Sequence, residues 1–98
     1  MIRFFKNLGT EDIFNGKDSS VARKICPQSL WKRAARKLDL LDSVTTIDEL
    51  QVPPGNRLER LKGDRQGQFS IRINDQYRIC FIWTDMEPDE VEIVDYHG

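Results

Sequence analysis

The sequence contains few of the side chains that bind transition metals or form disulfides. Its 98 residues include two cysteines and one histidine. Cys26 and Cys80 lie far apart and belong to no CxxC pair. A structural zinc site needs about four ligands at paired spacings, so we expect neither a metal nor another cofactor. Because no export signal is evident, we expect both thiols to be reduced and packed.

Long apolar runs are absent as well. No segment approaches the roughly 20 apolar residues of a membrane-spanning helix. The start, Met1 to Lys6, lacks the apolar core of a signal peptide. Charged residues make up 32% of the chain, which is above the average of about 25%. These features predict a cytoplasmic protein without a membrane partner, and the length fits one domain over residues 1–98.

The chain has almost no net charge, and a formal value of −1 would by itself disfavour a nucleic-acid binder. The charges are nevertheless segregated along the sequence. Residues 21–37 carry basic and no acidic side chains, residues 57–78 carry a basic excess, and residues 85–95 carry only acidic ones. The local field therefore matters more than the sum.

The first half of the chain has mainly helical patterns. Residues 2–5 form a short apolar run that suits an edge strand or a strand of a second layer. We expect a short helix from Thr10, as its N-cap, to Phe14, and then a polar loop over residues 17–25. From Pro27 to Leu41, apolar residues recur at spacings of three and four, which predicts an amphipathic helix.

The second half has the patterns of a sheet. Residues 68–73 alternate polar and apolar side chains, as a half-buried strand does, and residues 74–76 form a hairpin connection. Residues 77–83 are apolar on both faces except for one arginine, which predicts a central strand. An acidic turn over residues 84–89 and a last strand over 90–96 follow. Helices followed by an antiparallel sheet define an α+β fold.

The arginine of the central strand is Arg78. A charge in such a strand must reach solvent or pair with an anion, because an unpaired buried charge is very costly. One interpretation is a salt bridge to Asp95 or Asp64. The other is a contact with a phosphate, since the guanidinium fork matches phosphate geometry.

Two further segments can carry chemistry. Leu61 to Arg65 is either a charged turn or a loop that binds a phosphate through Lys62 and Arg65. The closing Asp95-Tyr96-His97 is either a solvated terminus or a set of acid–base groups. Asp95 and His97, two apart on a strand, are expected on one face. Histidine titrates near neutrality and can transfer protons there.

Together these groups can cleave RNA without a metal. The ribose 2′-hydroxyl attacks the adjacent phosphate, so the protein supplies no nucleophile. The site must provide a base, an acid for the leaving 5′-oxygen, and positive charge for the phosphorane. Cations, an imidazole, a carboxylate and a phenol meet these needs.

These residues also resemble a known family. Residues 61–71, Asn74 with Tyr77-Arg78-Ile79, and the closing Val94 to His97 are similar to HigB-type toxins of bacterial type II toxin–antitoxin modules, within the RelE/ParE superfamily. The likeness covers the whole chain. It implies a compact RelE/ParE-like α+β domain, with an N-terminal strand and two or three helices packed on a small antiparallel sheet.

The resemblance implies a function as well. HigB-type toxins are metal-independent endoribonucleases that cut mRNA in the A site of the 70S ribosome and so inhibit translation. A HigA-like antitoxin with a helix-turn-helix domain neutralises them, and the complex represses its own operon. This chain is therefore expected to meet operator DNA only through that complex.

By the same resemblance, Lys62 contacts the phosphate, Arg78 stabilises the phosphorane, and Asp95, Tyr96 and His97 form the acid–base and orienting end. The resemblance leaves open which of Tyr96 and His97 is the acid. The basic side chains that are candidates for RNA contact are Arg60, Arg65, Lys32, Arg33, Arg36 and Lys37. The last four cover one face of the predicted helix, which is either a solvated surface or a contact with ribosomal RNA.

One position departs from the family pattern. The family has a histidine three residues before the loop lysine, where this chain has Glu59. Either Glu59 takes over proton transfer or cleavage is slower, so a catalytically weakened toxin is one alternative. A second alternative is a ParE-like toxin that poisons DNA gyrase by binding. Fold likeness alone does not separate the two activities. The clustered acid–base groups favour the nuclease, because a toxin that acts only by binding has no need of them.

Overall fold

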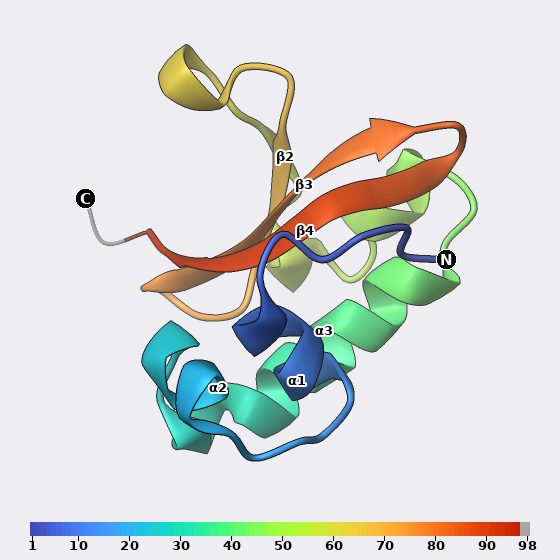
Figure 1. The fold of residues 1–98 in the computed structure, drawn as a ribbon. Helices are drawn as coiled ribbons and strands as arrows, with labels where there is room; N and C mark the ends of the chain where they lie inside the picture. Colours follow the sequence, from blue (N-terminus) through green and yellow to red (C-terminus); the bar gives the residue numbers. More distant parts are fainter. Residues whose placement is uncertain (97–98) are drawn as a thin grey trace.

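The computed structural model describes residues 1–96, which form a layer of helices against a layer of strands (Figure 1). The helices are α1 (Leu8–Phe14), α2 (Ser20–Ile25) and α3 (Trp31–Ser43). The strands are β1 (Glu59–Arg60), β2 (Phe69–Arg72), β3 (Tyr77–Thr84) and β4 (Glu87–Asp95). Short 3-10 turns connect the layers, among them η4 (Gly63–Arg65) between β1 and β2. The predicted α+β fold is confirmed.

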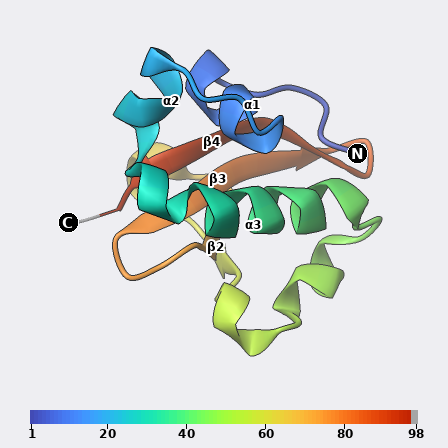
Figure 2. The same ribbon diagram turned by 90° about the horizontal axis from the view of Figure 1, so that it is seen from below.

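The strands form one antiparallel sheet in the order β1-β2-β3-β4. Ile71, Ile79 and Ile93 lie side by side across its three longer strands and are buried. The helices cover this face of the sheet, and α3 crosses it from one side to the other (Figure 2). Ala34, Leu38 and Leu41 of α3 close the core against the isoleucines. The amphipathic helix predicted over residues 27–41 is confirmed from Trp31 onwards, whereas Gln28–Leu30 form a 3-10 turn that precedes it.

Alternate strand residues face away from the helices. We call this second side of the sheet the open face; its members are Glu59, Ser70, Arg78, Cys80 and Glu92. It is the upper side in Figure 1, where the loop with η4 rises above the strands. Its polar and charged side chains contrast with the apolar face beneath.

The prediction of an N-terminal strand is wrong, because these residues do not form a regular strand. Residues 2–5 lie along β4 but form a single parallel bridge, between Phe5 and Val91. The backbone N–H of Lys6 donates to the carbonyl of Val91 at 2.8 Å, and the chain then turns into α1 at Asn7. The ring of Phe5 packs against Phe14, 5.2 Å between centroids. The early turn into α1 ends the pairing.

The start of the helical layer also differs from expectation. Asn7, and not Thr10, is the N-cap of α1, because its side-chain oxygen accepts a hydrogen bond from the backbone N–H of Thr10 at 2.8 Å. The Thr10 hydroxyl instead accepts from the backbone N–H of Ile93 at 3.1 Å, which ties α1 to β4. The predicted loop over residues 17–25 is wrong in part, because α2 begins after the N-cap Ser19.

The predicted acidic turn over residues 84–89 is shorter than expected. Asp85 and Met86 alone form the turn, with φ of 50° and 67°, which is the backbone twist that tight hairpins prefer. Pro88 lies within β4 opposite Trp83. Its missing N–H does not disrupt the sheet, and its carbonyl accepts a hydrogen bond from the backbone N–H of Arg3 at 2.8 Å. Within residues 1–96 no helix has the length and apolar character to cross a bilayer.

Gly9 marks the closest approach of α1 and α2 and generates a stability prediction. A Cβ at this position would lie 2.3 Å from Cγ1 of Ile25 and 2.7 Å from the carbonyl oxygen of Val21. We expect Gly9→Ala to lower the free energy of unfolding by about 1–3 kcal/mol through overpacking, although alanine is the better helix former. Urea denaturation measures the change. The matched control is Gly55→Ala, where nothing lies within 4 Å, and equal stability of both variants would contradict the prediction.

Candidate functional site

Arg78 is the centre of a small cluster on the open face. Its Nη2 lies 3.2 Å from Oε1 of Glu59, and its Nη1 donates to the Ser70 hydroxyl at 3.1 Å. The ring of Tyr96 lies over the guanidinium, 5.1 Å from Cζ to centroid. These contacts leave the Arg78 side chain only 12% exposed. Three separate segments therefore hold the guanidinium in one orientation.

The carboxylate that pairs with Arg78 is Glu59, a residue that the sequence had singled out without assigning it this partner. The expected partners, Asp95 and Asp64, were the wrong choice. Glu59 lies opposite Ser70 in the register of β1 and β2, so its side chain faces the same side as Arg78. The side chain of Glu59 is 48% exposed, and the pair is open to solvent on its carboxylate side.

The side chains of Asp95 and Tyr96, at the end of β4, face opposite sides of the sheet. Tyr96 is 41% exposed and stacks on Arg78. Asp95 pairs in register with Tyr77 and so faces the opposite side, where its Oδ2 accepts from Gln76 Nε2 at 3.1 Å. Burial, with a smaller effect of the Asp95 charge, raises the pKa of Tyr77. The structure thus unites Arg78 with Tyr96, while His97 lies outside the described residues.

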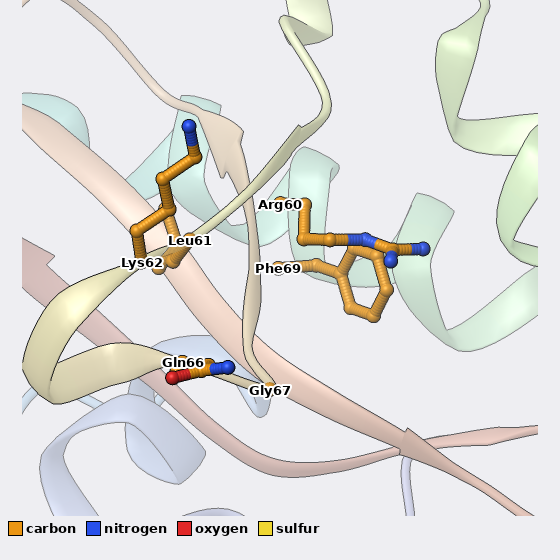
Figure 3. Close-up of a pocket in the computed structure, with 6 residues that line it drawn as sticks. All are labelled: Arg60, Leu61, Lys62, Gln66, Gly67 and Phe69. Atoms are coloured by element: carbon orange, nitrogen blue, oxygen red, sulfur yellow. The ribbon is translucent and has the colours of Figure 1, made fainter.

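Lys62 begins the loop that rises above the open face. It precedes η4 and is exposed. Figure 3 shows its ammonium group directed away from the Arg60 and Phe69 side chains. Arg65 is tied down by Gln68, at 3.0 Å, and by Glu92, at 3.6 Å. Arg65 therefore anchors the loop to β4. Of the two predicted phosphate-binding cations, Lys62 is the one exposed to solvent.

The predicted RNA contacts occupy two separate parts of the molecule. Arg60 lies at the β1 edge, with its guanidinium over the ring of Phe69. The other four predicted contacts belong to α3, which lies in the helical layer, in front of the sheet in the view of Figure 2. They are Lys32, Arg33, Arg36 and Lys37. The structure does not bring these four to the open face.

Lys37 and Arg33 of α3 lie near a third cation, Arg72 of β2. Lys37 donates to the side-chain oxygen of buried Asn56. Burial lowers the pKa of Lys37, and the neighbouring charges of Arg33 and Arg72 lower it further. Repulsion by these neighbouring cations disfavours the charged form of Lys37, although Arg72 is itself paired with Asp75.

Two buried or half-buried groups of the open face were missed in the sequence. Ser70 is fully buried beneath Arg78, and Glu92 joins Arg65 to Lys6, the latter at 3.1 Å. Both are polar residues that alternate with apolar ones in a strand. That alternation was the available signal, but it identifies a face of a strand and not a partner on its neighbour.

Cys80 lies between these charged groups, is fully buried, and has its pKa raised to about 11 by burial. Burial raises the pKa of Cys26 to about 11 as well. Since the thiolate is the reactive form, we expect neither thiol to react with iodoacetamide near neutral pH until the chain unfolds. Mass spectrometry before and after addition of urea measures this. Rapid alkylation of the native protein would show that one of the thiols is accessible and ionised.

Comparisons with known proteins test the predicted family. A family model for the RelE-like toxin of type II toxin–antitoxin system HigB matches residues 3–97. Toxin HigB-1 of Vibrio cholerae is 44% identical over 62 residues, which are 63% of this chain and 65% of that protein. An alignment with a Haemophilus influenzae protein, 39% identical, spans 62% of this chain and 60% of the relative. The chain thus covers less than two thirds of these two relatives.

A third relative and one solved structure match along their lengths. Endoribonuclease HigB of Proteus vulgaris is 33% identical over 99% of this chain and 100% of its own length. The YoeB-YefM complex of Staphylococcus aureus contains a chain with the same fold, at 17% identity and a TM-score of 0.59, covering 100% of this chain and 97% of that one. The predicted family is confirmed: this chain belongs to the HigB-like, RelE-like toxins of type II toxin–antitoxin systems.

Proposed function

We propose that this chain is an endoribonuclease that cuts mRNA in the ribosomal A site and thereby inhibits translation. The observation that carries the proposal is the Arg78 cluster, in which an arginine side chain that is 12% exposed is held beside an accessible carboxylate. Family membership and the name of the Proteus vulgaris relative support it. The reaction is an attack of the ribose 2′-hydroxyl on the adjacent phosphate, which requires no metal.

Arg78 stabilises the charge of the phosphorane. A fixed guanidinium stabilises developing negative charge without reorganising during the reaction. Ser70 and Tyr96 already fix it from two sides. Lys62, exposed at the start of the loop, supplies a second positive charge to the phosphate. Electrostatic stabilisation by two cations takes the place of a metal ion in this scheme.

Glu59 accepts the proton of the attacking 2′-hydroxyl. Its carboxylate lies 3.2 Å from Arg78 Nη2, so a phosphate bound by Arg78 has its neighbouring 2′-hydroxyl near Glu59. A general base must lie within hydrogen-bond reach of the proton it removes. The bond from the 2′-oxygen to phosphorus forms as the bond to the 5′-oxygen breaks, and the proton passes to Glu59.

Tyr96 or His97 returns a proton to the leaving 5′-oxygen. Tyr96 stacks on Arg78 and so lies next to the phosphate, whereas the role of His97 rests on the sequence alone. Asp95 acts as an orienting residue from the other face of β4, where it holds Gln76.

The partners follow from the same proposal. An exposed basic α3 on the layer opposite Arg78 suits a second contact, with ribosomal RNA, while Arg60 and Arg65 lie beside the mRNA. Such phosphate contacts weaken with salt.

In the cell, a HigA-like antitoxin with a helix-turn-helix domain neutralises the toxin, and operator DNA is bound through their complex. The chain acts in the cytoplasm, where its substrate is translated.

A purified translation mixture tests the reaction. We expect mRNA fragments cut at the A-site codon, with a 2′,3′-cyclic phosphate at the upstream end. Arg78→Ala should slow cleavage by about 10²–10³-fold, the usual cost of one group that stabilises an oxyanion, and His97→Gln should relieve growth arrest. Arg3→Ala, an arginine paired with Asp85 at 3.0 Å far from the cluster, is the matched control.

Three results would contradict the reaction. A 3′-hydroxyl on the upstream fragment would exclude attack by the 2′-hydroxyl. Full toxicity of both the Arg78 and the His97 variants, with folding verified by circular dichroism, would remove the catalytic assignment. A change in DNA topology without mRNA fragments would instead indicate a gyrase poison.

Separate variants test Glu59 as the base. Glu59→Gln keeps an oxygen that can accept from Arg78 but loses basicity, so we expect the cleavage rate constant to fall by about 10²–10⁴-fold. Glu59→His should restore part of the rate. Because imidazole titrates at about pH 6.5, the rate of Glu59→His relative to wild type should fall about tenfold between about pH 7.5 and about pH 5.5.

The control for Glu59 is Asp85→Asn, which replaces another arginine-paired carboxylate by an amide. Single-turnover cleavage on ribosomes gives the rates for all variants. Near-normal activity of Glu59→Gln would mean that Glu59 only holds Arg78 in place.

A further inference from the structure

Two arginines lie directly opposite each other on the open face. Arg72 of β2 is in register with Arg78 of β3. In the next pair along the strands, the backbone N–H of Ile73 donates to the carbonyl of Tyr77 at 2.9 Å. Because hydrogen-bonded and non-hydrogen-bonded pairs alternate, the two arginines form a non-hydrogen-bonded pair, the kind in which side chains lie closest. Like charges in this position destabilise a sheet, so packing alone does not account for the pair.

The two guanidinium groups pair with different carboxylates, on different sides. Arg78 pairs with Glu59 of β1, whereas Arg72 pairs with Asp75 in the turn between β2 and β3. The side chain of Asp75 is 97% exposed, so water screens this ion pair and it contributes little to stability. An anion from solution can therefore bind Arg72 beside Asp75 or in its place.

Arg57 is a third cation at the same end of the open face. Its carbonyl oxygen lies 3.5 Å from Nη1 of Arg78, and its φ of 45° is one that residues other than glycine seldom adopt. The hydrogen bond and the charge of Arg72 lower the pKa of Asp75, and the charge of Arg57 adds a smaller effect. Arg57 is exposed and forms no ion pair within residues 1–96. Three arginines thus meet two paired carboxylates here.

The turn between β2 and β3 is fixed by its own hydrogen bonds. The side-chain oxygen of Asn74 accepts from the backbone N–H of Gln76 at 2.9 Å and from that of Tyr77 at 2.7 Å. The turn lies at the same end of the sheet as the end of β4 (Figure 1). Arg78 and Arg72 therefore define a line from the proposed site of cleavage to a rigid turn.

We propose that the RNA strand passes over this end of the open face, with the cleaved phosphate at Arg78 and an adjacent phosphate held by Arg72 and Arg57. The proposal rests on the proposed mRNA cleavage and adds a second phosphate site to it. Guanidinium forks match the oxygens of a phosphate group. Consecutive phosphates repel each other, as the two opposed arginines do, so binding of the strand relieves both repulsions. A pair that is unfavourable in the free protein becomes favourable in the complex.

The test uses mRNAs in which one phosphate next to the cleaved one, on either side, is replaced by an uncharged methylphosphonate. For the wild type, we expect the neutral linkage on one side to slow single-turnover cleavage on ribosomes by about 10–100-fold, the cost of losing a hydrogen bond to a charged group. Arg72→Gln should cut unmodified mRNA more slowly by a similar factor, and the same linkage should slow this variant no further. Any effect of the linkage on the ribosome itself would slow both proteins equally.

Two further variants control for charge and for folding. Arg72→Lys keeps the positive charge and should regain part of the rate and part of the sensitivity to the neutral linkage. Arg23→Gln removes an arginine of the helical layer that is likewise paired with an exposed aspartate, Asp18, and should behave as the wild type. Circular dichroism verifies that each variant is folded.

Each outcome decides the matter. Loss of the linkage effect in Arg72→Gln, but not in Arg23→Gln, supports the proposal. A wild-type rate for Arg72→Gln overturns it, as does a slower variant that keeps its full sensitivity to neutral linkages on both sides.

Unchanged cleavage with weakened antitoxin binding would assign the arginines to an acidic segment of the antitoxin and also overturn the proposal. If the wild-type chain cuts no unmodified mRNA, the proposed function itself fails. That result is distinct, because it requires neither a variant nor a modified linkage.

Discussion

The contact between Arg78 and Glu59 is the constraint around which the rest of the open face is arranged. An arginine whose side chain is 12% exposed is stable only with partners that compensate for lost hydration. Ser70 is buried and accepts a hydrogen bond from Arg78, and the ring of Tyr96, just beyond the end of β4, packs against the guanidinium. The helices meanwhile pack on the opposite face, where Ile71, Ile79 and Ile93 exclude water. One side of a four-stranded sheet thus provides stability and the other provides charge.

This division lets positive charge concentrate locally in a chain of nearly zero net charge. The acidic residues of β4 include Glu92, which neutralises Arg65 and Lys6. Glu59 is the one carboxylate that pairs with Arg78 among residues 1–96, and Lys62 lies exposed in the loop above the strands. Local charge, and not the sum over the chain, decides where a phosphate is stabilised.

Periodicity in the sequence was sufficient for the main elements. Helix α3 and strands β2 and β3 were predicted because each has a repeated apolar spacing that one buried face requires. Periodicity did not predict the segments whose conformation depends on single contacts. Helix α2 has six residues and one buried side chain, Ala22, so it carries no periodic signal. The extended segment before α1 was mistaken for a strand because apolar content does not reveal where the chain turns away.

The candidate site shows the same limit. Polar residues in apolar strands, Arg78 above all, were visible as exceptions to the pattern. Their partners depend on strand register, which places Glu59 opposite Ser70 and sends Asp95 to the other face. A shift of one residue would exchange these roles. Sequence reasoning therefore singled out Arg78 but offered Asp95 or Asp64 as its salt-bridge partner, whereas Glu59 is the carboxylate that pairs with it.

The loop between β1 and β2 has a consequence for how the surface above the open face tolerates substitution. Lys62 and Gln66 are exposed, and the loop is attached to the sheet through Arg65 and through backbone hydrogen bonds. Substitutions at its exposed positions leave the core unchanged and cost little stability. The side chains that this loop presents to solvent can therefore change independently of the packing that holds the sheet together.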